Sequence, residues 1–293
     1  MQPPFVSVII PVFNDAKRLK LCLDALLRQT YPKNRYEVIV VDNGSTDNIR
    51  EVISNFPSVI FTSEKYPTSY AARNKGISIA KGEILAFTDS DCIPYSNWIE
   101  NGVKALFSVP NCGLAGGRIR LFPKNFNKIT AIEFFEMTNI LNQKNFIRVK
   151  FAATANVFIF KHIIDTIGNF DISFKSGGDV DLGRRIFKAG YNQIYADGAI
   201  VLHPTRGSLK RLLLMQQRIA GGLYNLQFKY DKIDLKKFIC EQWPKKTKFI
   251  YLWKSTKNKN LFFRLKVIFT LILVQIIRIS EFIRLCLGGK PRR

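Results

Sequence analysis

The chain has 293 residues, of which 47% are hydrophobic and 23% are charged, and its mean hydropathy is close to zero. This balance excludes a disordered chain, and the length is enough for one sizeable core or a large domain with an appendage. The five cysteines are scattered and form no CxxC pair, which argues against a disulfide framework or a zinc site and indicates a reducing compartment.

The first 90 residues alternate between two hydrophobic patterns. Short β-branched runs predict strands at 6–10, 37–41, 59–63 and 83–89, and apolar residues three or four apart predict helices at 19–29, 45–56 and 68–82. Ser45 is the expected N-cap of the second helix, and Gly82 is the expected stop of the third. The alternation implies parallel strands with right-handed crossovers, and therefore a layered α/β domain.

The pattern loosens after residue 114. A helix is expected at 129–141, short strands at 156–160 and 199–203, and a loop that enters a helix at 177–190. The character changes again near residue 206, where the chain becomes basic and helical. We therefore predict a first domain over residues 1–205 and a basic helical region over residues 206–293.

The charge lies mostly in this C-terminal region. Of the net charge of +23, +17 falls on residues 206–293, which indicates an anionic partner such as nucleic acid or an anionic membrane face. Lysines alternate with aromatic residues there, a pattern that permits nucleic-acid binding, but no nucleic-acid motif accompanies it, so no such partner is expected.

No signal peptide is visible before the first apolar run, and we expect a cytoplasmic N-terminus.

The last hydrophobic segment is too short for a simple membrane span. Its uncharged core, residues 267–277, has eleven residues, whereas a span needs about 20. This favours a helix lying in the membrane interface, with Arg264, Lys266, Arg278 and Arg284 reaching the headgroups. The alternative is a core helix packed on the domain. The first reading makes the protein peripheral or monotopic on the inner face of the cell membrane.

Three polar clusters follow predicted strands, at residues 11–14, 42–47 and 88–91. Ligands of such sheets bind beyond the carboxyl ends of the strands, so we expect these clusters to meet at one edge. In the third cluster, Asp89 and Asp91 point the same way from extended chain and are placed to share one Mg²⁺ or Mn²⁺ ion. The alternative is that they cap the helix that follows.

The other candidate residues also have structural alternatives. Asp42 either faces a nucleoside base or ribose or shapes an Asx turn, and both roles are compatible. Arg73 either meets a base or diphosphate or lies on a solvated helix face. Asp179 and Asp181 form a second acidic pair, a candidate general base or ordinary helix caps. His203 ends a short strand, where a lone histidine is more often structural than a ligand.

Together, five segments resemble the family 2 glycosyltransferases, in the same order and across most of residues 5–205. They read VSVIIPVFN, VIVVDNGSTD, ARNKGISIAKGEILAFTDSD, ANVFIFKHIIDTIGNFD and GGDVDLGRRIFKAG. The resemblance implies the GT-A fold, a Rossmann-like, mixed and mostly parallel sheet flanked by helices. It also implies transfer of a sugar from a nucleoside diphosphate-sugar, with inversion at the anomeric carbon.

The resemblance implies a role for each candidate residue. Pro11 and Asn14 would border the nucleoside pocket, Asp42 would bind the base or ribose, and Arg73 would lie near the nucleotide. The donor diphosphate would bind through Mn²⁺ or Mg²⁺ at the family's DxD motif. Asp89 and Asp91 would be the DxD carboxylates, and His203 would contact the metal or the diphosphate. Asp179 would be the general base, with Asp181 as the alternative base. Asn156 would form part of the acceptor-side wall.

Two departures from the family pattern bear on function. Gly178 stands where members often have the Glu of a Glu-Asp motif, and QQRIAGG replaces the QxxRW motif of processive polysaccharide synthases. We therefore expect addition of a single sugar to a lipid-linked or polysaccharide acceptor at the cytoplasmic membrane face. The alternative is a catalytically degenerate GT-A protein that acts as a membrane-bound assembly partner in glycan synthesis.

Overall fold

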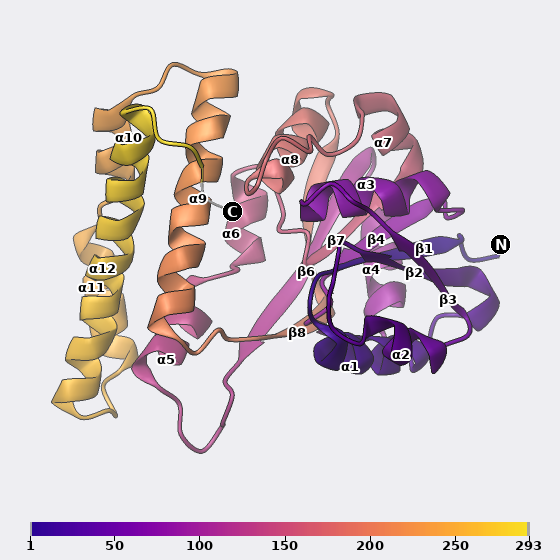
Figure 1. Ribbon diagram of the computed structural model, residues 1–293, viewed down its shortest axis with the longest axis horizontal. Coiled ribbons are helices and arrows are strands. Elements are labelled where there is room, and N and C mark those ends of the chain that lie inside the picture. Colours follow the sequence, from indigo (N-terminus) through magenta and orange to yellow (C-terminus); the bar gives the residue numbers. More distant parts are fainter. Residues whose placement is uncertain (1, 292–293) are drawn as a thin grey trace. The chain divides into compact units, whose positions relative to one another are not determined.

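The computed structural model describes residues 2–291, which divide into two compact units (Figure 1). The sheet unit holds the chain up to Arg120 together with Leu141–Ser173 and Gly178–His203. The helical unit holds Leu121–Ile140, Phe174–Gly177 and the chain from Pro204 onward.

The sheet unit is built on one eight-stranded mixed sheet, in the order β3-β2-β1-β4-β7-β6-β8-β5. The first four strands along the chain run parallel to one another, whereas β7 is antiparallel to both β4 and β6. The strands are β1 (Val6–Val12), β2 (Tyr36–Asp42), β3 (Val59–Ser63), β4 (Ile84–Thr88), β5 (Ile93–Pro94), β6 (Cys112–Phe122), β7 (Asn156–Phe160) and β8 (Asn192–Pro204).

Helices cover both faces of this sheet (Figure 1). Every residue of β1 and β4 is consequently buried, which explains why these strands read as continuous apolar runs rather than as alternating ones. The helices of the unit are α1 (Ala16–Leu27), α2 (Ile49–Ser54), α3 (Ser69–Ile79), α4 (Trp98–Leu106), α6 (Gln143–Arg148), α7 (Lys161–Ile167) and α8 (Gly178–Lys188). The α/β prediction is confirmed.

Two local predictions were wrong in detail. Helix α2 begins at Ile49 after Asn48, and Ser45 instead accepts a hydrogen bond from the Asn14 amide. Helix α3 ends at Ile79, before Gly82. Gly82 is needed for close approach, because a Cβ there would lie 2.4 Å from the backbone nitrogen of Ser7.

The helical unit contains α5 (Ala131–Asn139), α9 (Leu209–Tyr230), α10 (Leu235–Gln242), α11 (Lys246–Ser255) and α12 (Leu261–Cys286). Helix α12 packs along α9 and also contacts α5, α10 and α11. Its buried face includes Val267, Leu271 and Val274, which join a core with Leu212 of α9 and other apolar residues. Among the described residues, no helix combines the length and the apolar character needed to cross a membrane.

Candidate active site

The three polar clusters meet at the carboxyl edge of the parallel strands. Asn14, in the left-handed conformation with φ 49°, accepts a hydrogen bond from the Thr46 amide at 2.7 Å. Asp15 accepts one from the Ser90 hydroxyl at 2.8 Å. The loops after β1, β2 and β4 are therefore joined by side chains, as the position of their strands in a parallel sheet predicts.

The first carboxylate of the DxD pair is held by an arginine from α3. Nη2 of Arg73 lies 2.6 Å from Oδ1 of Asp89, and Arg73 is only 3% exposed. Arg73 is thus not on a solvated helix face. Its Nε is buried and has no hydrogen-bond partner among residues 2–291, so the cation retains an unused donor beside the carboxylate.

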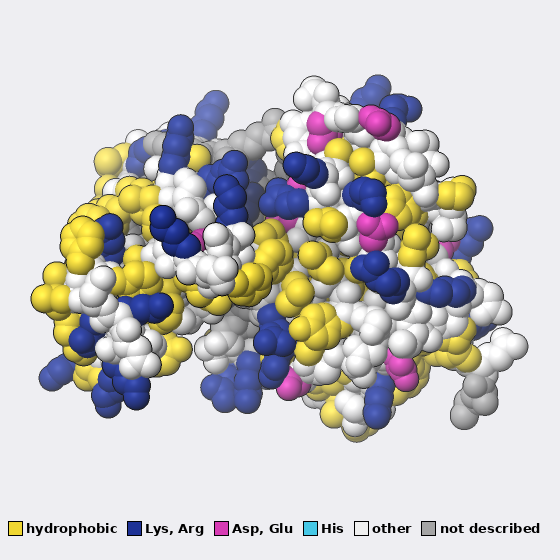
Figure 2. All heavy atoms as spheres, turned by 90° about the horizontal axis from the view of Figure 1, so that it is seen from below, with side chains coloured by type: hydrophobic (Ala, Val, Ile, Leu, Met, Phe, Trp, Pro, Cys, Tyr) yellow, Lys and Arg dark blue, Asp and Glu magenta, His cyan; other side chains and the backbone are white. Residues whose placement is uncertain are grey.

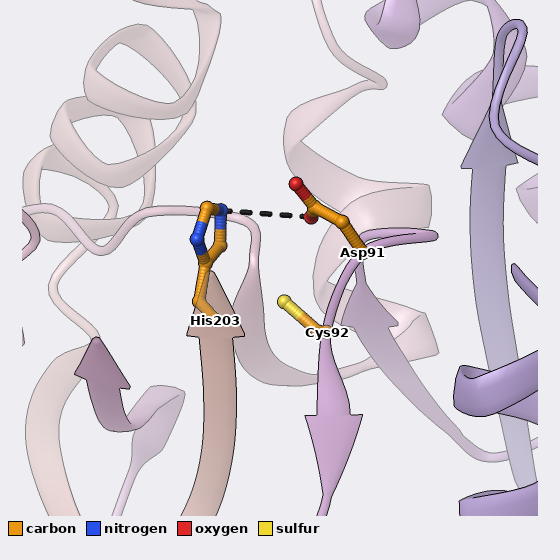
Figure 3. Close-up of side chains that lie close together, drawn as sticks. All are labelled: Asp91, Cys92 and His203. Carbon is orange, nitrogen blue, oxygen red and sulfur yellow. Dashed lines mark ion pairs between the residues drawn. The ribbon is translucent and has the colours of Figure 1, made fainter. Parts of the chain in front are cut away.

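The second carboxylate, Asp91, lies between two cationic or titratable groups. Its Oδ1 is 3.5 Å from Nε2 of His203, at the end of β8, and the two side chains point toward one another (Figure 3). Its Oδ2 is 3.5 Å from Nη1 of Arg18, which also pairs with Asp15 at 2.6 Å. Arg18 and Asp15 were missed in the sequence, although they directly follow the first polar cluster.

This geometry gives a donor set for a hard divalent cation. Ligand atoms of Asp91, Cys92 and His203 lie within 4.8 Å of one another (Figure 3). Cys92 is fully buried, its thiol donates to the Ala155 carbonyl, and burial, followed by the nearby Asp91 and Asp89, raises its pKa well above the usual value. A protonated thiol is a poor ligand, so the fitting donors are carboxylate oxygens and an imidazole nitrogen, which suit Mn²⁺ or Mg²⁺.

Asp179 lies in the first turn of α8 and is half-buried. Its Oδ1 accepts a hydrogen bond from the Val180 amide at 3.0 Å and lies 3.5 Å from the Tyr70 hydroxyl. Burial raises the pKa of this carboxyl above its ordinary value, the positive charge of Arg73 lowers it, and Asp89 adds a smaller upward effect. A carboxylate with a raised pKa is better matched to proton abstraction near neutral pH.

Two predicted site residues lie in the interior instead. Asp181 is completely buried and pairs with Nε of Arg185 at 2.9 Å, so it holds α8 together rather than facing a cleft. Asn156 is also completely buried. Its side-chain oxygen accepts a hydrogen bond from Nε1 of Trp98 at 2.8 Å, and its Nδ2 donates to two backbone carbonyls at 2.9 Å. With these contacts made, Asn156 is part of the core and not an acceptor-side wall.

The remaining predicted residues flank the edge. Asp42 ends β2, and its Oδ1 accepts a hydrogen bond from the amide of Ser45, three residues on, at 3.0 Å, so the carboxylate helps to shape the turn after β2. Pro11 is buried in β1 opposite Val41, where β4 no longer pairs with β1. Asp42 is only partly buried, so the turn leaves it at the surface of the edge.

Solved structures share this architecture. The mannosyltransferase PcManGT from Pyrobaculum calidifontis, solved with GDP-Man and Mn²⁺, superposes with a TM-score of 0.67. The match covers 98% of this chain and 88% of that one at 17% sequence identity, which shows a common GT-A fold. TarS from Staphylococcus aureus, solved with UDP, matches with a TM-score of 0.53 and 16% identity.

Sequence comparison extends the likeness beyond the fold. Glycosyltransferase AglE of Haloferax volcanii is 38% identical over 240 residues, which cover 80% of this chain and 77% of AglE. Dolichyl N-acetyl-α-D-glucosaminyl phosphate 3-β-D-2,3-diacetamido-2,3-dideoxy-β-D-glucuronosyltransferase of Methanococcus voltae is 27% identical over 234 residues, or 74% and 72% of the two chains. The model of glycosyl transferase family 2 matches residues 7–168, and this chain belongs to that family.

Proposed function

We propose that this glycosyltransferase moves a single sugar from a nucleoside diphosphate-sugar to a lipid-linked or polysaccharide acceptor at the cytoplasmic face of the membrane, with inversion. The observation that carries the proposal is the contact of Asp91 with His203 at the sheet edge, two residues after the Asp89 that pairs with Arg73, together with a separate, half-buried Asp179. These are the two kinds of group that the reaction needs, one for the leaving diphosphate and one for the acceptor hydroxyl.

Asp89, Asp91 and His203 would hold Mn²⁺ or Mg²⁺. The cation would balance the charge that grows on the diphosphate when the glycosidic bond breaks. Arg73, held against Asp89, is suited to add positive charge beside the diphosphate. Pro11, Asn14 and Asp42 would border the nucleoside, since they belong to the strand ends and loops that adjoin the same edge.

Asp179 would act as the general base. It would take the proton of the acceptor hydroxyl while that oxygen attacks the anomeric carbon, and the nucleoside diphosphate would leave from the opposite side of the sugar. A single displacement of this kind inverts the anomeric centre and needs no covalent enzyme intermediate. We retain Asp179 and not Asp181, because Asp181 is buried against Arg185.

A lipid-linked acceptor is supported by a relative. The Methanococcus voltae enzyme is named for a dolichyl-linked sugar phosphate, and its match spans most of both chains. Addition of one sugar rather than a polymer is supported by the QQRIAGG segment, which lacks the QxxRW motif of processive synthases.

Membrane association is assigned to residues 206–293, and the transfer chemistry to residues 1–205. Helix α12 exposes Phe262, Leu265, Phe269 and Ile276, on the surface left uncovered by its packing in the helical unit. Figure 2 shows hydrophobic and basic side chains interspersed at the left of the view, where these helices lie. Exposed apolar groups among cations suit the interface of an anionic bilayer.

The donor and the metal are tested by thermal shift with UDP-, GDP- and dTDP-sugars, each with and without Mn²⁺. We expect at least one donor to raise the melting temperature only when Mn²⁺ is present. Asp89→Ala should abolish this shift and lower transfer at least 100-fold, because it removes both a metal ligand and the partner of Arg73. Asp165→Ala removes an exposed carboxylate paired with Lys161 and serves as the matched control.

Full transfer by the Asp89→Ala variant would exclude the metal role. A wild-type protein that binds none of the donors would instead favour the degenerate assembly partner.

Membrane binding is tested separately by flotation with vesicles of phosphatidylcholine alone or with phosphatidylglycerol added. We expect flotation only with the anionic lipid, weakening as salt rises, and equal flotation with both vesicles would contradict this proposal.

A further inference from the structure

The aromatic ring of Tyr70, on α3, occupies the space beside the first residue of α8. Gly178 is buried, and a Cβ built there would lie 2.8–3.0 Å from three carbon atoms of the Tyr70 ring. Real Cβ atoms essentially never come within 3.0 Å of other heavy atoms, so a side chain at position 178 requires the ring to move. The glycine and the tyrosine are therefore a matched pair.

The ring is held in place on several sides. Tyr70 is 6% exposed and stacks on Phe170 with the ring centroids 5.6 Å apart, and Phe170 in turn meets Phe87 edge-on at 5.5 Å. The guanidinium of Arg73 lies 5.7 Å from the centroid of the Tyr70 ring. These contacts prevent the ring from swinging aside without a rearrangement of the core.

The ring directs its hydroxyl at the proposed base. The Tyr70 oxygen is 3.5 Å from Oδ1 of Asp179, at the long end of hydrogen-bond range, and such contacts often tighten once substrate is bound. Burial, and to a lesser degree the negative charge of Asp179, raises the pKa of the Tyr70 phenol, which therefore stays a neutral donor. The oxygen that Tyr70 approaches also accepts from the Val180 amide.

We propose that Tyr70 is a positioning residue for Asp179: its ring excludes any side chain at position 178, and its hydroxyl orients the carboxylate toward the acceptor. This inference rests on the proposed role of Asp179 as the base. The charges of Arg73 on α3 and of Asp89 after β4 also act on Asp179. Arg73 contacts both the Tyr70 ring and Asp89. The same set of contacts therefore holds Asp89, on the proposed sugar-donor side, and Tyr70, beside the proposed base.

The hydroxyl is tested with Tyr70→Phe, which keeps the ring. We expect a loss in kcat of about 10-fold with little change in KM for the donor, because a donor to a charged group is removed from the reacting state. The control is Tyr31→Phe, which removes another hydroxyl that donates from a buried tyrosine, to the Pro4 carbonyl at 2.6 Å. That control should lower stability and leave kcat unchanged.

A second measurement does not depend on turnover. Carbon-13 NMR of the aspartate carboxyls, with Asp179→Asn to assign the signal, reports the pKa of Asp179 directly. Tyr70→Phe should raise this pKa by about one unit, because a hydrogen bond to the ionised form is lost. If Tyr70→Phe changes neither kcat nor this pKa, the hydroxyl has no positioning role.

The matched pair is tested by a double-mutant cycle. Gly178→Ala should lower the melting temperature by about 5 °C in the presence of Tyr70, and should raise it slightly in a Tyr70→Ala background, since alanine favours a helix. An equal loss in both backgrounds would contradict the pairing. A wild-type protein without transfer activity would refute the proposed function, while the NMR titration and this cycle would still decide the role of Tyr70.

Discussion

The two units differ in how they hold a buried arginine and in how much apolar surface they expose. In the sheet unit, the arginines near the site are committed to carboxylates, as Arg73 is to Asp89 and Arg185 to Asp181. In the helical unit, Arg278 is bound by the neutral amides of Gln216 and Gln242, and burial lowers its pKa to about 10. Although the helical unit is the shorter one, it carries most of the large exposed hydrophobic side chains.

This difference supports the proposed division of roles between the two units. The sheet unit concentrates paired charges at one edge, so a ligand there replaces existing ion pairs with its own. The helical unit exposes apolar side chains among lysines and arginines over a broad surface, which suits a partner without a defined shape. The predictions that follow test this division, beginning with the largest expected effect.

Asp179→Asn tests whether the sheet unit keeps a charge for chemistry at the expense of stability. We expect kcat to fall about 1,000-fold, because the amide cannot accept the proton, while donor-dependent thermal shifts persist. Asp165→Asn is the control, since Asp165 is an exposed carboxylate on α7. A variant that retains most of its kcat would remove Asp179 from the mechanism.

The same variant has a predictable effect on stability. Burial raises the pKa of Asp179 above 3.8, so the folded state binds this proton more tightly than the unfolded state does. Its contribution to stability is therefore present below pH 3.8 and is lost as the pH rises through the folded pKa. Asp179→Asn should gain stability relative to the wild type between pH 4 and pH 7, as followed by urea unfolding.

Asn156→Ala tests whether this residue belongs to the core or to the site. It leaves the Trp98 indole N–H and two buried carbonyls without partners, so we expect a loss of about 2–4 kcal/mol in the free energy of unfolding. The folded fraction should keep the wild-type KM for the acceptor. A raised KM with unchanged stability would restore Asn156 to the acceptor side.

The surface of the helical unit is tested with the double variant Phe262→Glu and Phe269→Glu on α12. Both rings are exposed, and their replacement by carboxylates should weaken binding to anionic vesicles about 10-fold without unfolding the protein. Phe107→Glu alters an exposed phenylalanine of the sheet unit and is the matched control. Equal weakening in both proteins would mean that α12 is not the membrane surface.

The sequence predicts the fold where local and tertiary preferences agree. Strands β1, β2, β3 and β4 are apolar runs between turn residues, and their order along the chain already implies a parallel arrangement. Strand β6 was missed because Gly116 and Gly117 interrupt its pattern. The reason is tertiary: a Cβ at Gly117 would lie 2.4 Å from the side chain of Asn156.

The site was predictable to the extent that it depends on strand ends. Asp89, Asp91 and Asp42 follow apolar runs, and the topology then brings them to one edge. The pairing of Asp181 with Arg185 and the burial of Asn156 depend on which way a side chain faces, which spacing alone does not determine. The contact between Tyr70 and Asp179 joins residues 109 positions apart, and no local pattern marks it.

Asp47 links the loop after β2 to the start of helix α1, which matters for engineering of this loop. Its Oδ2 accepts the hydrogen bond of the Ala16 amide at 2.9 Å, so a residue of the loop after β2 caps the start of α1. The same helix carries Arg18, which contacts Asp91. Transplanting residues 43–48 would therefore also disturb Arg18 and its contact with Asp91, at the proposed diphosphate end of the site, unless the graft retains an acceptor at position 47.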